Sequence, residues 1–227
     1  MAKSKTAASK PAARVLIVDD HPAVREALVI RISTQPDLKV CGEAADVAEA
    51  LRLATDAHPD VAVIDIGLEK GCGIDLIKRI KARNIRVRMI VWSMYGEGLY
   101  AERALRAGAM GYITKGQATG TIIDAIRQVL DGKMYLSAAM TEKLLKRVVG
   151  PGGQDSKRSP VEALSDRELV VFRQIGLGLK TQEIAAQLHL SVKTVETYRD
   201  RIREKLGLST GAELARSAMQ WMLEAGK

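Results

Sequence analysis

Between Arg14 and Gly132, short apolar runs alternate along the chain with stretches of helical period. Most of the apolar runs are hydrophobic on both faces, which is typical of strands in a parallel sheet covered by helices. The predicted strands are 14–18, 38–41, 61–64, 87–92 and 109–113, and the predicted helices are 22–34, 47–57, 74–82, 99–106 and 119–130. Five such units predict an α/β fold, a doubly wound five-stranded parallel sheet with right-handed crossovers.

The remainder of the chain carries helical patterns only. A short helix is predicted at 135–149, and the stretch 150–160, rich in glycine, proline and charge, indicates a flexible linker. Ser165-Asp-Arg-Glu168 and Thr210-Gly-Ala-Glu213 have the spacing of capping boxes, and Thr181 and Ser191 are predicted N-caps. Helices opened at these four positions predict a smaller, all-α four-helix domain.

These patterns divide the chain into four parts. We expect a disordered basic tail at 1–13, the α/β domain at 14–132, a linker with a short helix at 133–160 and the helical domain at 161–227. The tail lacks the apolar segment of a secretory signal, and no run is long enough to span a membrane. Cys41 and Cys72 are too few for a disulfide framework. We therefore expect a cytoplasmic protein, and its net charge of +8 weakly suggests a polyanionic partner.

Polar residues follow several of the predicted strands. Asp19 and Asp20 end the first strand, Asp65 the third, Ser93 the fourth and Lys115 the fifth. Ligands of doubly wound sheets bind at the carboxyl ends of strands, so these side chains are expected to meet at one edge. Clustered carboxylates favour Mg²⁺, and a nearby ammonium group can hold a phosphoryl oxygen. The pattern indicates transfer of phosphate onto a carboxylate.

Residues 14–131 resemble the receiver domain of response regulators. The resemblance rests on Val-Leu-Ile-Val-Asp19-Asp20-His-Pro, Val-Ala-Val-Ile-Asp65, Ser93 and Lys115. It implies that Asp65 accepts the phosphoryl group, Lys115 is the family's invariant lysine, and Ser93 and Tyr112 are the switch residues. It also implies a flavodoxin-like strand order and a Mg²⁺ ion on Asp19, Asp20, Asp65 and the Gly67 carbonyl, with Asp19 acting through water. One departure is that no proline follows Asp65 in Ile-Gly-Leu-Glu-Lys-Gly-Cys-Gly73.

The segment 181–200 is predicted to form a helix, a short turn and a second helix. The second helix carries apolar Val195, Ile202 and Leu206 on one face, with Tyr198 also expected inward. A helix of this size fits the major groove of DNA. Its candidate DNA contacts, which reach phosphates or base edges, are Lys193, Glu196, Thr197, Arg199, Arg201, Arg203 and Lys205.

Residues 161–225 resemble the LuxR-type helix-turn-helix domain. The matching motifs are Leu164-Ser-Asp-Arg-Glu168, Glu183-Ile-Ala, Leu190-Ser-Val-Lys-Thr-Val-Glu-Thr-Tyr-Arg199 and Lys205-Leu-Gly-Leu208. A receiver joined to this module resembles the NarL/FixJ family of response regulators. The resemblance implies a transcription regulator that takes phosphate from a sensor histidine kinase, binds DNA, and forms a homodimer when phosphorylated. We expect no membrane partner, and no enzyme activity beyond Mg²⁺-dependent self-phosphorylation and slow autodephosphorylation.

Two alternatives have discriminating features. Phosphohydrolases also use an aspartate on such a sheet, but they place an acid-base residue two positions later, where this chain has Gly67. A phosphorylation-independent DNA binder would not need Asp19, Asp20 and Lys115 together. A phosphoryl group on Asp65 is expected to draw Ser93 toward its new oxygens, after which Tyr112 turns inward. The output would be either dimerisation or release of an occluded DNA-binding domain.

Overall fold

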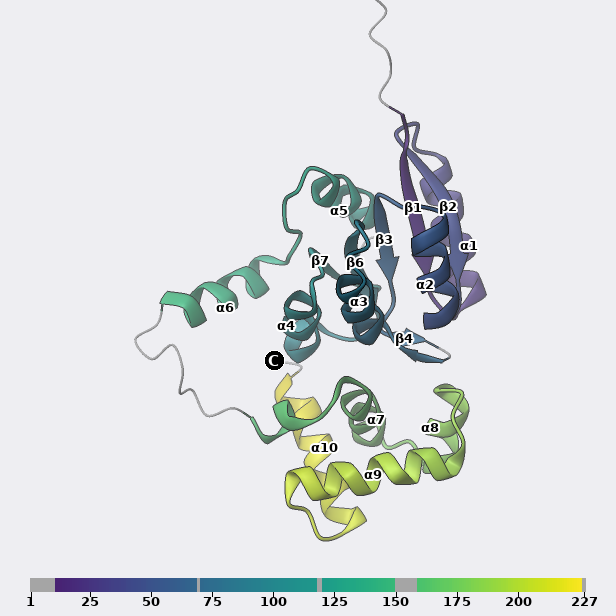
Figure 1. Ribbon diagram of the computed structural model, residues 1–227. Helices are drawn as coiled ribbons and strands as arrows, with labels where there is room; N and C mark the ends of the chain where they lie inside the picture. Colours follow the sequence, from purple (N-terminus) through teal and green to yellow (C-terminus); the bar gives the residue numbers. More distant parts are fainter. Residues whose placement is uncertain (1–10, 69, 118–119, 150–158, 226–227) are drawn as a thin grey trace, which may run out of the picture.

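The computed structural model describes residues 11–68, 70–117, 120–149 and 159–225. Its main sheet has five parallel strands: β1 (Ala13–Val18), β2 (Leu38–Ala44), β3 (Val61–Ile64), β6 (Arg88–Ser93) and β7 (Gly111–Thr114). The strand order is β2-β1-β3-β6-β7 (Figure 1). This is the flavodoxin-like order, and it confirms the predicted α/β class.

Helices cover both faces of the sheet. Side chains alternate along each strand, so Val15 and Ile17 pack with α1 (Pro22–Ser33) and α5 (Thr121–Leu130). Leu16 and Val18 point the other way. They belong to the apolar cluster that includes α2 (Val47–Asp56), α3 (Gly73–Ala82) and α4 (Glu97–Ala107). Because both faces are buried, the strands have the continuous apolar sequence on which their prediction rested.

A small antiparallel hairpin, which the sequence did not predict, follows the third strand of the main sheet. Strands β4 (Gly67–Leu68) and β5 (Gly71–Cys72) pair Gly67 with Cys72 and Leu68 with Gly71. Two-residue strands are too short to show an alternating pattern. Gly71 has a φ of +125°, a conformation that L side chains rarely adopt, so glycine suits this turn. The hairpin occupies the run that lacks the family's proline.

The second domain is helical, as predicted. It contains the 3₁₀ turn η1 (Pro160–Ala163) and helices α7 (Asp166–Gly176), α8 (Thr181–Gln187), α9 (Val192–Leu206) and α10 (Gly211–Ala225). Ser165 caps α7 in a capping box with Glu168, and the Ser191 side chain accepts from the Thr194 N–H. The predicted cap at Thr181 is wrong. Lys180 is the N-cap residue, and its N–H donates to Glu183 Oε2 at 2.6 Å.

Along the chain, α6 (Ala138–Val149) lies between the two domains. It begins later than predicted because Tyr135 forms a β-bridge with Gly111. Figure 1 shows this helix extending from the receiver beside α4. Residues 1–10 of the expected tail and residues 150–158 of the expected linker lie outside the described residues. Within the described part of the chain, no helix has the length and apolarity needed to cross a membrane.

Candidate phosphorylation site and DNA interface

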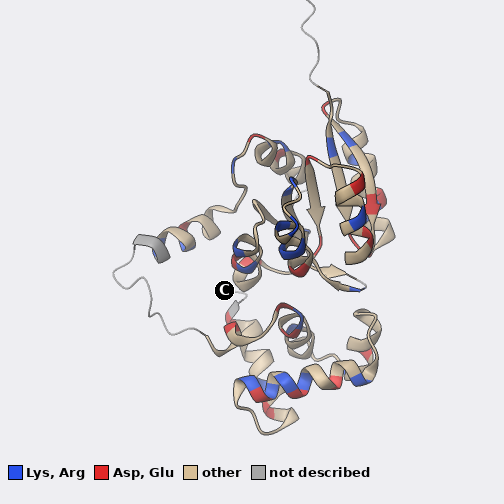
Figure 2. Cartoon of the chain, in the orientation of Figure 1, with Lys and Arg blue, Asp and Glu red and all other residues tan. Residues whose placement is uncertain are grey.

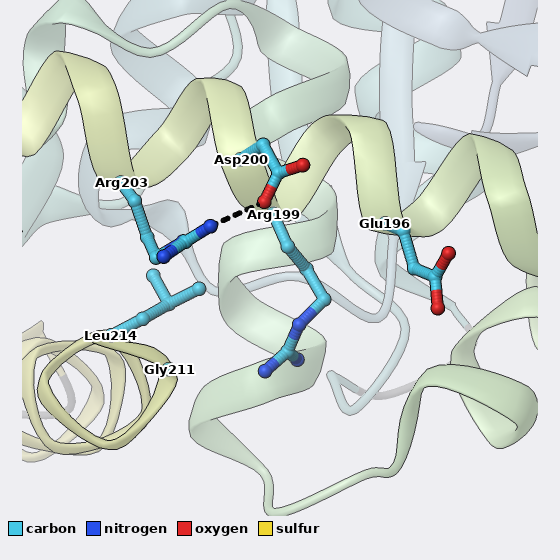
Figure 3. A pocket seen from close by; sticks show the side chains of 6 residues that line it. All are labelled: Glu196, Arg199, Asp200, Arg203, Gly211 and Leu214. Atoms are coloured by element: carbon cyan, nitrogen blue, oxygen red, sulfur yellow. Dashed lines mark hydrogen bonds and ion pairs between the residues drawn. The ribbon is translucent and has the colours of Figure 1, made fainter. Parts of the chain in front are cut away.

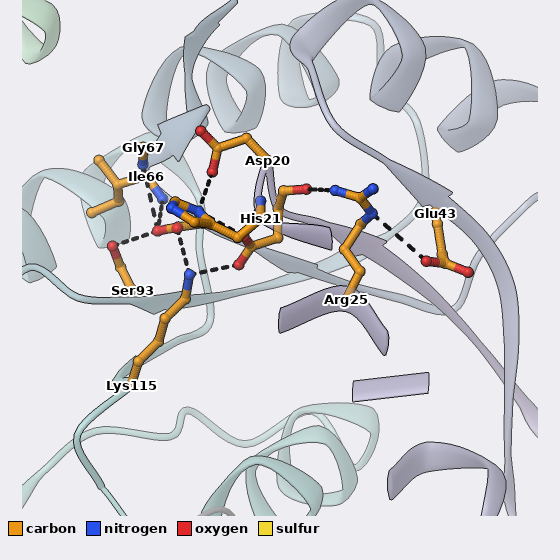
Figure 4. Close-up of polar contacts among 10 residues, drawn as sticks. Asp20, His21, Arg25, Glu43, Ile66, Gly67, Ser93 and Lys115 are labelled. Carbon is orange, nitrogen blue, oxygen red and sulfur yellow. Dashed lines mark hydrogen bonds and ion pairs between the residues drawn. The ribbon is translucent and has the colours of Figure 1, made fainter. Parts of the chain in front are cut away.

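Acidic side chains and one lysine meet at the carboxyl ends of β1, β3 and β7 (Figure 4). Lys115 Nζ lies 2.6 Å from Asp19 Oδ2 and 2.6 Å from Asp65 Oδ2. Both carboxylates are almost fully buried, and only 7% of the Lys115 side chain is exposed. The strands are parallel, so residues distant in sequence reach one rim, as the sequence predicted.

The Asp65 carboxylate is held on its other oxygen by three donors. Oδ1 accepts from Ser93 Oγ at 2.6 Å, from the Ile66 N–H at 2.6 Å and from the Gly67 N–H at 3.4 Å. These bonds fix the plane of the carboxylate and leave Oδ2 toward Lys115. The arrangement presents a carboxylate oxygen beside a cation, which suits a nucleophile that attacks an anionic phosphoryl group.

Charge and burial oppose each other at this site. Burial raises the pKa of Asp65 above its usual range, Lys115 acts to lower it, and Asp19 adds to the increase. Burial alone would lower the pKa of Lys115, but the Asp65 and Asp19 carboxylates outweigh it, so the pKa is raised. Lys115 therefore carries its charge at neutral pH. It offsets part of the repulsion between the carboxylates.

The acidic residues are also suited to a divalent cation. Ligand atoms of Asp19, Asp20, His21 and Asp65 all lie within 4.8 Å of one another. Asp20 Oδ1 is buried without a hydrogen bond, and its close neighbour is His21 Nδ1 at 2.6 Å. A buried carboxylate oxygen without a hydrogen bond is costly unless a cation compensates it. Three clustered carboxylates are the oxygen ligands that Mg²⁺ prefers, so these residues fit that ion.

The two expected switch residues both lie near the acceptor carboxylate. The Ser93 hydroxyl donates to Asp65 Oδ1 at 2.6 Å. Tyr112 is buried, with 1% of its surface exposed. Its hydroxyl donates to the Tyr95 carbonyl at 2.7 Å, and Tyr95 belongs to the loop before α4. This backbone partner stabilises the inward position of Tyr112.

Replacing Lys115 with alanine should separate metal binding from signalling. The three carboxylates remain, so Mg²⁺ should still bind, whereas the phosphoryl group would lose its cation. We expect loss of any gain in DNA affinity caused by phosphorylation, a gain of about 5- to 150-fold for typical coupled sites. Mg²⁺ titration and DNA titration measure the two properties. Lys146→Ala, which removes an exposed lysine from α6, is the control. If phosphorylation raises the DNA affinity of Lys115→Ala as much as that of the wild type, Lys115 has no part in signalling.

The helix-turn-helix unit presents α9 to solvent on the side of the molecule away from the sheet (Figures 1 and 2). Val195 and Ile202 are fully buried against the domain, whereas Tyr198 is only partly buried. Among the DNA candidates, Lys193, Glu196, Thr197, Arg201 and Lys205 are exposed, whereas Arg199 and Arg203 are partly buried. Lys193, Thr197 and Arg201 line one shallow groove along the helix. Basic and acidic side chains both occur on this face, so it offers both hydrogen-bond donors and acceptors.

Arg199, Arg203 and Lys205 have polar neighbours within the DNA-binding domain. Arg203 pairs with Asp200 at 2.5 Å, and Lys205 pairs with Glu168 of α7 at 2.6 Å. Arg199 lies with Glu196, Asp200 and Arg203 around a second groove, between α9 and the start of α10 (Figure 3). Lys205 is exposed but already pairs with a carboxylate of its own domain. Among the predicted basic contacts, Lys193 and Arg201 are thus the best placed.

The receiver packs against α7 rather than α9. Arg103 of α4 donates to the carbonyls of Val161, Glu162 and Leu164, at 2.7 to 3.3 Å. Asp166 lies 3.0 Å from Arg103 and 2.6 Å from Lys78 of α3. Sequence reasoning missed these residues because an arginine or lysine on an amphipathic helix looks the same whether it faces solvent or another domain. The contact leaves α9 uncovered.

The fold and site therefore define a response regulator, and comparison with known families agrees. The model of the response regulator receiver domain matches residues 15–127, and that of bacterial regulatory proteins of the luxR family matches residues 162–218. The chain belongs to the response regulators that join a receiver to a LuxR-type DNA-binding domain. It is not a catalytic enzyme apart from the phosphorylation chemistry of receivers.

Relatives span nearly the whole chain. The response regulator GacA of Pseudomonas aeruginosa is 34% identical over 207 residues, covering 91% of this chain and 95% of GacA. The oxygen regulatory protein NreC of Staphylococcus carnosus is 34% identical over 210 residues, covering 91% and 97%. RcsB of Salmonella enterica, solved on a promoter with the phosphomimetic BeF₃⁻, is 25% identical with a TM-score of 0.55, covering 90% and 96%. Another RcsB structure contains two dimers bound to two parallel DNAs.

Proposed function

We propose that this protein accepts a phosphoryl group on Asp65 from a sensor histidine kinase and thereby controls its binding to DNA. The observation that carries the proposal is the buried Asp19–Lys115–Asp65 cluster, with both Lys115 contacts at 2.6 Å. Ion pairs buried this deeply are costly to assemble, so a purely structural cluster would gain little from them. As a regulator of transcription, it would act in the cytoplasm with its DNA.

The chemistry follows from the positions of the carboxylate oxygens. Asp65 Oδ2 would attack the phosphorus of the kinase's phosphohistidine, forming an O–P bond as the N–P bond breaks and the histidine keeps the electron pair. Asp19, Asp20, Asp65 and the Gly67 carbonyl would hold Mg²⁺, which neutralises charge on the phosphoryl oxygens when bound. Lys115 would remain paired with the transferred group. With Gly67 two positions after Asp65, no side chain there can activate water, so hydrolysis would be slow.

The exposed position of α9 bears on the output. The receiver covers α7, so α9 is free to enter the major groove in the same arrangement. This favours dimerisation over release of an occluded recognition helix. Solved RcsB dimers on DNA are consistent with that choice. Two such units would bind half-sites about one DNA turn apart, or a multiple of it.

Titration of two DNA fragments tests this function. Phosphorylation should raise affinity for a two-half-site operator by about 5- to 150-fold and hardly change affinity for one half-site. Ser93→Ala should reduce the gain without blocking phosphate uptake, because it removes a donor to Asp65 but not the nucleophile. Equal gains on both fragments would favour release of an occluded helix. No gain on either fragment would contradict phosphorylation control and leave a phosphorylation-independent DNA binder.

Alanine substitutions on α9 test the DNA interface. Lys193→Ala and Arg201→Ala should each weaken binding, since both side chains are exposed on one groove of the helix. Loss of a phosphate contact should reduce the salt slope by about one unit. Loss of a base contact should instead cost about 1–3 kcal/mol and relax specificity at one position. Lys39→Ala, an equal charge loss on the receiver strand β2, should change neither quantity. If both α9 variants bind DNA with unchanged affinity, this face of α9 is not the DNA interface.

A further inference from the structure

The β4–β5 hairpin connects the phosphoacceptor loop with the DNA-binding domain. Its turn lies beyond Gly67, two residues after Asp65, and its second strand leads directly into α3. Strand β5 also packs near α7 (Figure 1). The hairpin is therefore close to the reacting carboxylate at its base and to the other domain at its tip.

A buried arginine joins the two domains at this tip. One N–H of the Arg167 guanidinium, on α7, donates to the Gly71 carbonyl oxygen of the hairpin. An N–H on its other terminal nitrogen donates at 3.2 Å to the carbonyl oxygen of Leu188, the residue after α8. Only 8% of Arg167 is exposed. A guanidinium group buried between carbonyls depends on both of them for its solvation, so losing either one is costly.

At its base, the hairpin is tied to Asp65. The Ile66 N–H donates to Asp65 Oδ1 at 2.6 Å, and the Gly73 N–H donates to the Ile66 carbonyl at 2.9 Å. A Cβ on Gly73 would lie 2.0 Å from the Asp65 carbonyl oxygen, so the two backbones are in close contact. With so little free space, displacement of the Ile66 and Gly67 amides must be passed on to the hairpin.

We propose that Arg167 makes the β4–β5 hairpin a second route between the phosphorylation site and the DNA-binding domain, separate from Ser93 and Tyr112. This inference rests on the proposed phosphorylation of Asp65. New phosphoryl oxygens would compete with Asp65 Oδ1 for the Ile66 and Gly67 N–H groups. The paired strands would then carry the Gly71 carbonyl away from Arg167, and docking of the two domains would weaken.

A hydrogen bond from a charged donor is worth about 10- to 150-fold in an equilibrium constant, and this sets the upper range of the coupling. Coupling between binding equilibria is reciprocal, so weaker docking must tighten phosphoryl-group binding by the same factor. Arg167→Ala should therefore bind BeF₃⁻ with Mg²⁺ more tightly than the wild type, although Arg167 does not touch the site.

Amide hydrogen exchange in the full chain tests the inference. In the wild type, Mg²⁺ with BeF₃⁻ should raise exchange in α7 and in the hairpin. In Arg167→Ala, these peptides should already exchange rapidly, and BeF₃⁻ should add little. Asp166→Asn is the matched comparison, because it weakens docking at Lys78 and Arg103 but keeps the hairpin bond. Its hairpin peptides should still respond to BeF₃⁻.

Arg167 also donates to the Leu188 carbonyl, so Arg167→Ala could disturb the fold of its own domain. A variant in the receiver separates that effect from loss of the hairpin contact. Gly71→Ala would place a Cβ 2.5 Å from Val47 Cγ2 at a φ of +125°, which must displace the hairpin tip without altering the DNA-binding domain. It should increase exchange in α7 as Arg167→Ala does. If BeF₃⁻ protects the peptides around Asp65 but both variants respond in α7 like the wild type, the hairpin route is wrong and the proposed phosphorylation stands. If the wild type binds neither BeF₃⁻ nor phosphate, the proposed function fails and the route fails with it.

Discussion

Replacing Asp65 with asparagine is expected to abolish phosphate uptake from a small phosphodonor in the presence of Mg²⁺. An amide is a poor nucleophile, and the change also removes one of the three carboxylates expected to hold the metal. The substitution preserves the shape of the side chain, so the hydrogen bond from Ser93 Oγ to Oδ1 can remain. Intact-protein mass measurement would detect the added phosphoryl group in the wild type and its absence in the variant.

Asp56→Asn is the matched control for this experiment. Asp56 is an exposed residue at the end of α2, where its partner is Arg52 at 3.6 Å. The Asp56→Asn variant should take up phosphate like the wild type. An adduct on Asp65→Asn equal to that of the wild type would show that another residue is the acceptor.

The second large effect is expected in the core of the DNA-binding domain. Phe172 of α7 is completely buried, and its ring centroid lies 5.7 Å from that of Trp221 in α10. Truncating such a side chain to alanine costs about 3–5 kcal/mol, because it removes apolar contacts and leaves a cavity. Denaturant unfolding followed by circular dichroism would measure this loss. DNA binding should fall in parallel, because α7 and α10 support the bundle that carries α9.

Phosphate uptake distinguishes local from general damage in Phe172→Ala. The face of the sheet that packs with α1 and α5 has a separate apolar cluster, which contains Val15 and Ile17. The receiver should therefore keep its reaction while DNA binding is lost. Leu177→Ala, at a position that is 50% exposed, should change stability by no more than about 0.5 kcal/mol. Similar losses in both variants would contradict the packing argument.

The sequence was most informative where burial leaves a simple pattern. All four residues of β3, Val61–Ile64, are buried, and they form one continuous apolar run. Such runs predicted the five parallel strands, and the strand order then confirmed the fold class. The hairpin at Gly67–Cys72 was missed because each of its strands has only two residues. Its structure depends on tertiary contacts that local periodicity does not record.

The sequence predicted which residues form the candidate site, but not all the contacts that these residues make. Residues that follow parallel strands must share one edge, so the meeting of Asp19, Asp65 and Lys115 could be foreseen. The position of Tyr112 in this structure could not, since it depends on tertiary contacts of its hydroxyl with the carbonyls of Tyr95 and Gly96. The interdomain contacts of Arg103 and Arg167 gave no sequence signal, because they form only when the domains meet. The functional roles of all these residues stay predictions until the variants are measured.

The lysine at the phosphorylation site also has an optical consequence. Lys115 Nζ lies 5.6 Å from the ring centroid of Trp92, which is 9% exposed. A charge that shifts beside an indole changes the energy of its excited state, so the intrinsic fluorescence of Trp92 would report events at Asp65 without an attached dye. The chain has two tryptophans, and the other, Trp221, packs on Phe172 in the DNA-binding domain. Each domain thus carries one tryptophan, and a Trp221→Phe variant would isolate the tryptophan signal of the receiver.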